Sequence, residues 1–147
     1  MMIVLEGVDG VGKTTLATLL SKTLNAGIIH ATRETPNDWA WFSELMDLAR
    51  SHNVIMDRAF WGQFVYQDPE DRKLTFEQLH ELEHRLHQEG GHLIYVTATD
   101  EDIKSRLGAR QETLSLPLEV LKHRYAIQLS LADCPVITYN TSNGEVT

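Results

Sequence analysis

Residues Gly7 to Thr14 have the residue types and the spacing of a phosphate-binding loop. The segment reads GVDGVGKT and fits the pattern G-x-x-x-x-G-K-S/T at every fixed position. In such a loop, glycines let consecutive backbone N–H groups turn toward phosphate oxygens, and the helix that follows adds a partial positive charge. We therefore expect a binding site for ATP, formed by Gly7, Gly10, Val11, Gly12, Lys13, Thr14 and Thr15.

Three side chains of this loop carry chemistry of their own. We expect Lys13 to reach the β- and γ-phosphates of ATP and the Thr14 hydroxyl to ligate Mg²⁺. Asp9 is the unexpected member, because a loop that only binds phosphate gains nothing from a negative charge. The role of Asp9 and the identity of the phosphate acceptor are therefore linked questions.

The elements around the loop alternate between strand and helix along the chain. Apolar runs indicate the strands, and apolar residues that recur on one face indicate the helices. The expected strands are 3–5, 28–31, 54–56, 93–96 and 136–139, and the expected helices are 14–24, 38–50, 75–89, 100–107 and 117–133. Asp100 is the expected N-cap of the fourth helix. Segment 59–67 indicates neither state, and the residues after 139 read as a polar tail.

This alternation is typical of an α/β fold with a parallel sheet of about five strands and helices on both faces. Ligands of such sheets bind beyond the carboxyl ends of the strands. We therefore expect the chemistry at 7–14, 32–36, 57–58 and 97–100. The chain has 147 residues and no linker or repeat, so we expect one domain that spans 1–147.

Charge and composition limit the class of partner. The chain has 13 basic and 21 acidic residues and a formal net charge of −8, which argues against nucleic acid as the main partner. It has one cysteine, Cys134, which suits a reducing compartment, and no apolar run of membrane-spanning length. We expect a cytoplasmic protein, in the host cytoplasm if the source is viral, with no membrane partner.

Several segments resemble the thymidylate kinases. Residues 6–15 (EGVDGVGKTT) look like that family's phosphate loop, and 32–36 (TRETP) are similar to its T-R-E-P segment. Residues 57–67 (DRAFWGQFVYQ) resemble its D-R-Y-x-x-S-x-x-A-Y-Q motif, and 100–110 with 124–125 resemble the lid region and the last helix. The resemblance implies a P-loop kinase fold, ATP-dependent phosphoryl transfer to a deoxynucleoside monophosphate, and a possible homodimer.

The resemblance also implies a role for individual residues. Asp9 would accept a hydrogen bond from the 3′-hydroxyl of the acceptor, and Arg58, helped by Arg33, would bind its 5′-phosphate. Asp57 would lie near Mg²⁺ through water. Gln63 aligns with a position that hydrogen-bonds the acceptor base.

Tyr66 aligns with a position that favours deoxyribose. For Gln63 and Tyr66, simple packing within an aromatic-rich segment is an alternative of equal weight. Gly10 stands where some family members have a catalytic arginine, which shifts that role to the lid. Arg106 and Arg110 lie four residues apart at a helix end, so they can point together toward the transferred phosphoryl group.

Two other functions stay open at this point. One is a kinase whose acceptor is a hydroxyl, of a deoxynucleoside or of 5-hydroxymethyluracil in phage DNA; it would need a carboxylate base such as Asp9, Glu34 or Asp57. The other is a nucleotide-binding regulatory protein or NTPase without an acceptor. Its ATP hydrolysis would not be accelerated by added nucleotides.

Two further patterns have a structural and a functional interpretation. The chain is short between 37 and 56, and the aromatic residues there could stack on a base or form the apolar face of a helix; they are Trp39, Trp41 and Phe42. Residues 80–84 (HELEH) match the zinc-protease pattern H-E-x-x-H. We interpret them as the polar margin of a helix whose apolar stripe is Leu79, Leu82 and Leu86.

Overall fold

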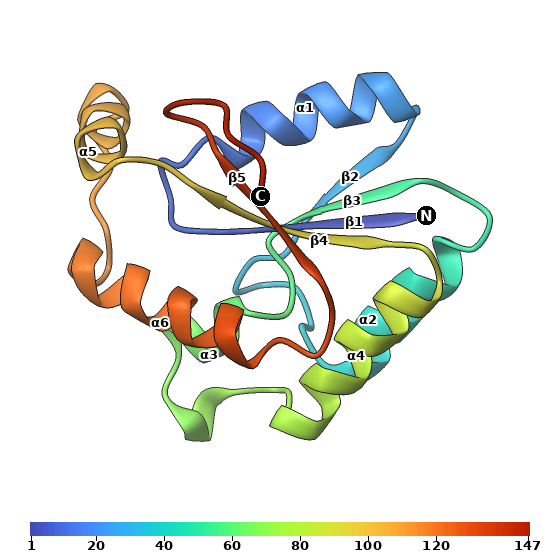
Figure 1. Cartoon of the computed structure of the whole chain (residues 1–147). Helices are drawn as coiled ribbons and strands as arrows, with labels where there is room; N and C mark the ends of the chain where they lie inside the picture. Colours follow the sequence, from blue (N-terminus) through green and yellow to red (C-terminus); the bar gives the residue numbers. More distant parts are fainter.

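A twisted parallel sheet forms the centre of the molecule (Figure 1). The computed structural model describes all 147 residues. The strands are β1 Met2–Glu6, β2 Gly27–His30, β3 Val54–Asp57, β4 His92–Thr97 and β5 Val136–Asn140. They are joined in the order β2-β3-β1-β4-β5, and every pair is parallel. The predicted five-stranded parallel sheet is confirmed.

Helices cover both faces of this sheet, as predicted. They are α1 Lys13–Leu24, α2 Trp39–Leu48, α3 Gly62–Tyr66, α4 Phe76–Gln88, α5 Asp100–Ala109 and α6 Leu118–Leu131, with a 3₁₀ turn at Pro69–Asp71. In Figure 1, α1 lies on one face, and α2, α3, α4 and α6 lie on the other. Helix α5 stands at the end of the sheet where β1 and β4 finish, so it is close to the phosphate loop.

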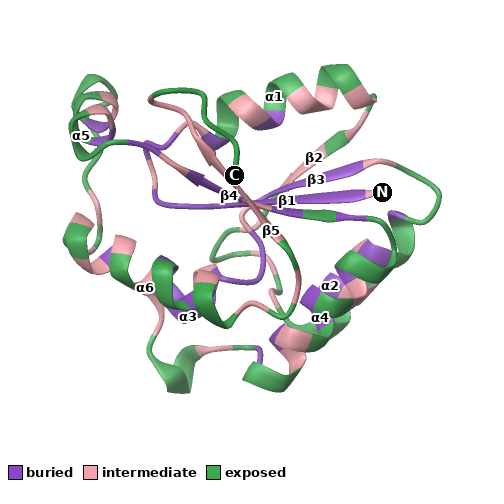
Figure 2. Ribbon diagram, in the orientation of Figure 1, coloured by how far each residue is buried: buried purple, intermediate pink, exposed green.

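Burial is greatest in the middle of the sheet (Figure 2). Every residue of β1 and of β3 is buried, whereas every residue of β5 is only partly buried. Parallel strands that are covered on both faces have continuous apolar sequences, which explains why apolar runs alone indicate them. The buried centre fixes the two strand ends, Glu6 and Asp57, from which the site extends.

Three sequence expectations need correction or completion. The N-cap of α5 is Thr99, whose hydroxyl accepts a hydrogen bond from the Asp102 amide; Asp100 lies within the helix and pairs with Lys122 at 2.5 Å. The ambiguous segment 59–67 contains the short helix α3.

The polar tail folds back on β5. The Thr147 amide donates to the Thr138 carbonyl at 2.8 Å, and that bond is reciprocated at 2.8 Å. The tail therefore continues the structure beside β5, which the polar composition did not reveal. None of the helices has the length and apolar character needed to cross a bilayer.

Candidate active site

The phosphate loop joins the buried strand β1 to helix α1, and its glycines are needed because there is no room for a side chain. A Cβ at Gly7 would collide with the Val96 carbonyl oxygen. A Cβ at Gly10 would lie 3.1 Å from Leu107 Cγ and 3.2 Å from the Ile103 carbonyl oxygen, both in α5. Gly10 also has φ +88, a conformation that favours glycine. The loop is thus packed against its surroundings on two sides.

Lys13 points back into this loop. Its ammonium donates to the Gly7 carbonyl at 2.6 Å and to the Val8 carbonyl at 2.9 Å. Burial lowers its pKa to about 8, against the opposing effects of Asp57 and Glu6. The side chain therefore carries a positive charge at neutral pH, at the mouth of the loop where phosphate would bind.

Two oxygen ligands suited to Mg²⁺ lie beside the loop. The Thr14 hydroxyl donates to Asp57 Oδ2 at 3.2 Å, and His30 Nδ1 lies 3.1 Å from the same carboxylate oxygen. A hydroxyl and a carboxylate next to a phosphate loop fit the hard, oxygen-preferring Mg²⁺ ion. The predicted metal residues Thr14 and Asp57 are therefore neighbours.

Arg58 follows β3 in an unusual backbone conformation, with φ +68. The turn is held by Glu6, whose buried carboxylate accepts the Trp61 amide at 2.6 Å and the Ala59 amide at 3.3 Å. The Arg58 amide itself donates to the Leu5 carbonyl at 2.9 Å. A left-handed residue at a strand end costs about 1–3 kcal/mol and persists only where neighbours impose it. These bonds fix the direction of the Arg58 side chain.

That side chain reaches the phosphate loop. Its guanidinium forms an ion pair with Asp9, and its Cζ lies 5.5 Å from the centre of the Tyr66 ring. Asp9 is 44% exposed and Arg58 is 32% exposed, so the pair is accessible to a ligand. Asp9 and Arg58, which were predicted from two distant segments to bind the acceptor, are therefore in contact.

Helix α5 brings a second arginine to the loop. Arg106 Nη1 donates to the Gly10 carbonyl at 3.1 Å and to the Thr141 hydroxyl at 3.0 Å. Arg110, one turn further, lies at the helix end with its Nη2 3.7 Å from Glu112. Arg106 is therefore docked on the loop, and Arg110 has only an exposed partner.

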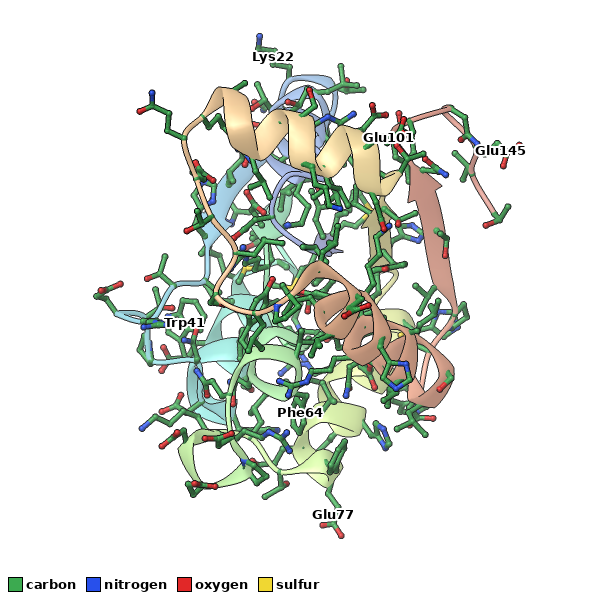
Figure 3. All side chains as sticks on the ribbon, turned by 90° about the vertical axis from the view of Figure 1, so that its left-hand side faces the viewer. Lys22, Trp41, Phe64, Glu77, Glu101 and Glu145 are labelled. Atoms are coloured by element: carbon green, nitrogen blue, oxygen red, sulfur yellow. The ribbon has the colours of Figure 1, made fainter.

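These groups line one cavity of about 1020 Å³. Its lining combines five cations, which are Lys13, Arg33, Arg58, Arg106 and Arg110, with three carboxylates, which are Asp9, Glu34 and Asp57. The whole chain, in contrast, has a net charge of −8. Figure 3 looks at this end of the molecule, where α5 lies above α6. The cavity is a local excess of positive charge suited to anionic ligands.

Most predicted site residues lie in this cavity. The lining includes Asp9, Gly10, Gly12, Lys13, Thr14, Thr15, Arg33, Asp57, Arg58, Arg106 and Arg110. Gly7 and Val11, which also belong to the loop, are buried. Of the four strand-end segments expected to carry chemistry, 97–100 does not reach the cavity, and the end of β5 takes its place.

Gln63 and Tyr66 do not line this cavity, and their predicted contacts with the acceptor stay predictions. The Gln63 amide donates to the Asn37 carbonyl at 2.5 Å and accepts the amides of Lys73 and Leu74 at 2.7 and 3.0 Å. Gln63 thus closes the loop after α3. Tyr66 lies under Arg58 with its hydroxyl buried and without a partner.

The structure adds three residues that the sequence reading did not assign to the site. His30 lies beside Asp57, Thr141 beside Arg106, and Glu6 behind Arg58. His30 and Thr141 come at or directly after strand ends, so the strand-end rule could have found them. Glu6 had no signal beyond its place in the loop motif, because its role depends on backbone amides 53 and 55 residues away in the sequence.

The remaining aromatic and histidine patterns have structural roles. Phe42 is buried and packs edge-on to Trp41 and to Phe60, at 5.1 and 5.0 Å between ring centres. Trp39 donates to Glu81, the acidic residue of the H-E-x-x-H pattern, at 3.0 Å. The apolar stripe of α4 is buried, as expected from Leu79, Leu82 and Leu86.

No protein-family model and no curated protein matches this sequence. Solved structures do match its fold. The YorR protein of Bacillus subtilis, in complex with phosphorylated GDP, is 28% identical with a TM-score of 0.78, over 96% of this chain and 86% of that one. Deoxyadenosine kinase from M. mycoides with bound dATP is 19% identical with a TM-score of 0.62, over 95% and 91%.

Thymidylate kinase from Candida albicans is 18% identical with a TM-score of 0.56, over 96% of this chain and 84% of that one. Two of these three neighbours are thus kinases, one of a nucleoside and one of a nucleotide. The chain has the P-loop fold of these kinases, and the fold predicted from the resemblance is confirmed.

Proposed function

We propose that this protein transfers the γ-phosphoryl group of ATP to a deoxynucleoside monophosphate. One observation carries the proposal: five cations converge on a single cavity in a strongly acidic chain, and two of them, Arg33 and Arg58, come from the segments after β2 and β3 and belong neither to the phosphate loop nor to α5. The triphosphate of ATP would be bound by the loop and Lys13. A second anionic ligand would account for Arg33 and Arg58.

The loop supplies the binding site for ATP. Its backbone amides and Lys13 would hold the β- and γ-phosphates, and Arg106 and Arg110 would approach the γ-phosphate from α5. Thr14 and Asp57 would hold Mg²⁺, which when bound neutralises charge on these phosphates. The arrangement resembles donor sites in which catalysis consists of positioning and charge stabilisation.

Arg58 and Arg33 supply the acceptor site. The Arg58 guanidinium is paired with Asp9. An acceptor phosphate would replace or share this partner, and Asp9 would then be free to accept a hydrogen bond from a sugar hydroxyl. The two substrates would thereby meet above the loop, with the acceptor phosphate in line with the γ-phosphorus.

This chemistry needs no general base. An acceptor phosphate is already anionic at neutral pH, so its oxygen attacks the γ-phosphorus while the bond to the β-phosphate breaks and ADP leaves. The cations of the cavity neutralise the charge that two phosphate groups bring together. A monophosphate therefore uses the cavity as it stands.

A hydroxyl acceptor is the second candidate, and one observation favours it. Glu34 lines the cavity and accepts no hydrogen bond from another side chain, so a carboxylate base is available there. The similarity to deoxyadenosine kinase is compatible with such an acceptor. A deoxynucleoside, or a hydroxymethylated base in DNA, would then be the substrate.

A coupled assay of ADP release separates these functions. The acceptor panel is dTMP, dCMP, dGMP, dUMP, GDP, thymidine and DNA that contains 5-hydroxymethyluracil. We expect release to depend on one of the monophosphates. A response to thymidine or to the modified DNA alone would favour the hydroxyl acceptor.

ATP hydrolysis that no acceptor accelerates would contradict both kinase functions. It would instead support a nucleotide-binding protein without an acceptor. A Glu34→Gln variant sharpens the choice, because loss of a base should reduce transfer to a hydroxyl much more than transfer to a phosphate.

A further inference from the structure

Helix α5 rests on the phosphate loop. The contact is made at Gly10, where a Cβ would lie within 3.3 Å of atoms in both Ile103 and Leu107. Ile103 is fully buried and Leu107 is nearly so. The inner face of α5 is thus packed on the loop backbone, and Gly10 is the residue that allows the approach.

This packing places Arg106 in a fixed position. Its Nη1 donates to the Gly10 carbonyl at 3.1 Å and to the Thr141 hydroxyl at 3.0 Å. Its Nε and Nη2 groups have no protein partner, so they remain available to a ligand in the cavity that Arg106 lines. One edge of the guanidinium is used for anchoring and the other is free.

Thr141 connects three parts of the site. Its hydroxyl donates to the Val11 carbonyl of the loop at 2.6 Å while it accepts from Arg106. Its amide donates to the Thr97 carbonyl at the end of β4 at 2.9 Å. A single hydroxyl therefore joins the phosphate loop to the arginine of α5, and the backbone of the same residue is fixed to the sheet.

The next residue fixes the start of α5. Ser142 Oγ accepts the Thr99 amide at 2.9 Å and donates to Asp102 Oδ2 at 2.6 Å. The chain then turns back, and Val146 bridges to Tyr139 in β5. Thr141 is thus held in place by the β5 strand before it and by residues 142–147 after it. The Ser142 contacts also hold the start of α5, independently of the loop that follows that helix.

We propose that Thr141 is a positioning residue that holds Arg106 against the phosphate loop. The inference rests on the proposed function for the role of Arg106 at the transferred phosphoryl group. Helix α5 and the C-terminal segment then hold this arginine at the loop together. Arg110, which lacks such anchoring, is the arginine left to respond to the ligand.

The test compares Thr141→Val, which removes the hydroxyl and keeps the shape, with Thr141→Ser, which keeps the hydroxyl. We expect Thr141→Val to lower kcat about tenfold with less than about a twofold change in the KM for ATP, since misplacing a positioned group mainly affects the transition state. Thr141→Ser should retain kcat within about twofold. Circular dichroism melts check that both variants are folded.

A double-mutant cycle with Arg106→Ala separates positioning from general stability. If Thr141 acts through Arg106, Thr141→Val should have no further effect on kcat in the Arg106→Ala background. An equal loss of kcat in both backgrounds, or an unchanged kcat in Thr141→Val alone, would overturn the proposal.

Hydrogen exchange supplies a readout that needs no acceptor. In the nucleotide-free protein, amides of α5 should exchange faster in Thr141→Val than in the wild type or in Thr141→Ser. If no acceptor is phosphorylated but α5 is released in this way, the proposed function fails and the docking stands. If exchange in α5 is unchanged, the docking role of Thr141 is wrong whatever the enzyme's substrate.

Discussion

The donor and acceptor sides of the cavity are built by different means. On the donor side, the loop is enclosed by β1, α5 and the C-terminal segment; a Cβ at Gly7 would collide with a carbonyl oxygen, and one at Gly10 would press on α5. On the acceptor side, Arg58 is directed by a strained turn and paired with Asp9, and Arg33 projects from the loop after β2. The first is fixed by packing and backbone hydrogen bonds, the second by charges that a ligand can exchange.

This difference indicates how one scaffold can keep its donor while its acceptor varies. Backbone amides and buried contacts recognise phosphate without regard to the rest of the ligand. Ion pairs near the surface are worth little on their own and reorganise easily. We therefore expect substitutions on the donor side to lower activity toward every acceptor, and those on the acceptor side to change substrate preference.

The largest expected effect comes from the donor side. Lys13→Met removes the buried ammonium of the loop and should lower kcat/KM about 10³-fold, the upper range for removal of one charge-stabilising group. Lys22→Met, an exposed lysine near the other end of α1, is the matched control and should keep the wild-type rate. Steady-state kinetics with saturating acceptor measures both, and similar losses would contradict the role of Lys13.

Arg58→Ala tests the acceptor side. Removal of a charged hydrogen bond should lower kcat/KM for the acceptor about 10–100-fold while the Kd for ATP, measured by calorimetry, stays within about twofold. Arg72→Ala is the control, because Arg72 also lies over an aromatic ring, at 4.8 Å from the centre of Phe64, but outside the cavity. Loss of ATP binding in Arg58→Ala would show that Arg58 belongs to the donor side and would contradict its role in binding the acceptor.

Glu6 links the two sides, because it ends the strand that leads into the phosphate loop and accepts hydrogen bonds from the turn that carries Arg58. Burial raises the pKa of its carboxyl from 4.5 to about 7, against the lowering effect of the Trp61 and Ala59 amides. Since the folded pKa lies above the unfolded value, the stability that this group contributes is fully present below about pH 4.5 and is lost as the pH rises through about 7.

Urea denaturation at several pH values tests this shift. Between about pH 5 and pH 8, the free energy of unfolding of the wild type should fall relative to that of Glu6→Gln by about 2–3 kcal/mol. Parallel stability curves for the two proteins would show that Glu6 titrates normally.

Gly10→Ala tests the packing of α5 on the donor side and has the smallest expected effect. The new methyl group would press on Leu107 and Ile103 in a backbone conformation that disfavours alanine, which should cost about 1–2 kcal/mol of stability and less than about tenfold in kcat. Gly108→Ala, within α5 and facing open space, should instead stabilise the protein by up to about 1 kcal/mol. Thermal melts measure both changes, and equal melting temperatures would argue against close packing at Gly10.

The sequence was sufficient for the sheet and for the loop because both depend on local patterns. Buried strands appear as apolar runs, and the glycine–lysine–threonine spacing has a direct geometric meaning. The N-cap of α5 was misplaced by one residue, since Thr99 and Asp100 are both good caps and only the tertiary pairing of Asp100 with Lys122 decides between them.

The parts of the site that escaped prediction depend on contacts between distant segments. Thr141 reaches Val11 across 130 residues, and nothing in the composition of a polar tail indicates that contact. Gln63 matched a motif by position, but its amide is used to hold the backbone of 73–74. A motif places a residue on an element, whereas the packing of other elements decides which way its side chain points.

A bisubstrate analogue tests the central claim most directly, namely that the cavity holds two phosphorylated ligands facing each other. The compound joins adenosine to a deoxynucleoside through five phosphates, and calorimetry measures its binding. We predict that one molecule binds per chain at least about 100-fold more tightly than ADP, and that Arg58→Ala removes most of this gain. Binding no tighter than that of ADP, with no dependence on Arg58, would contradict the account.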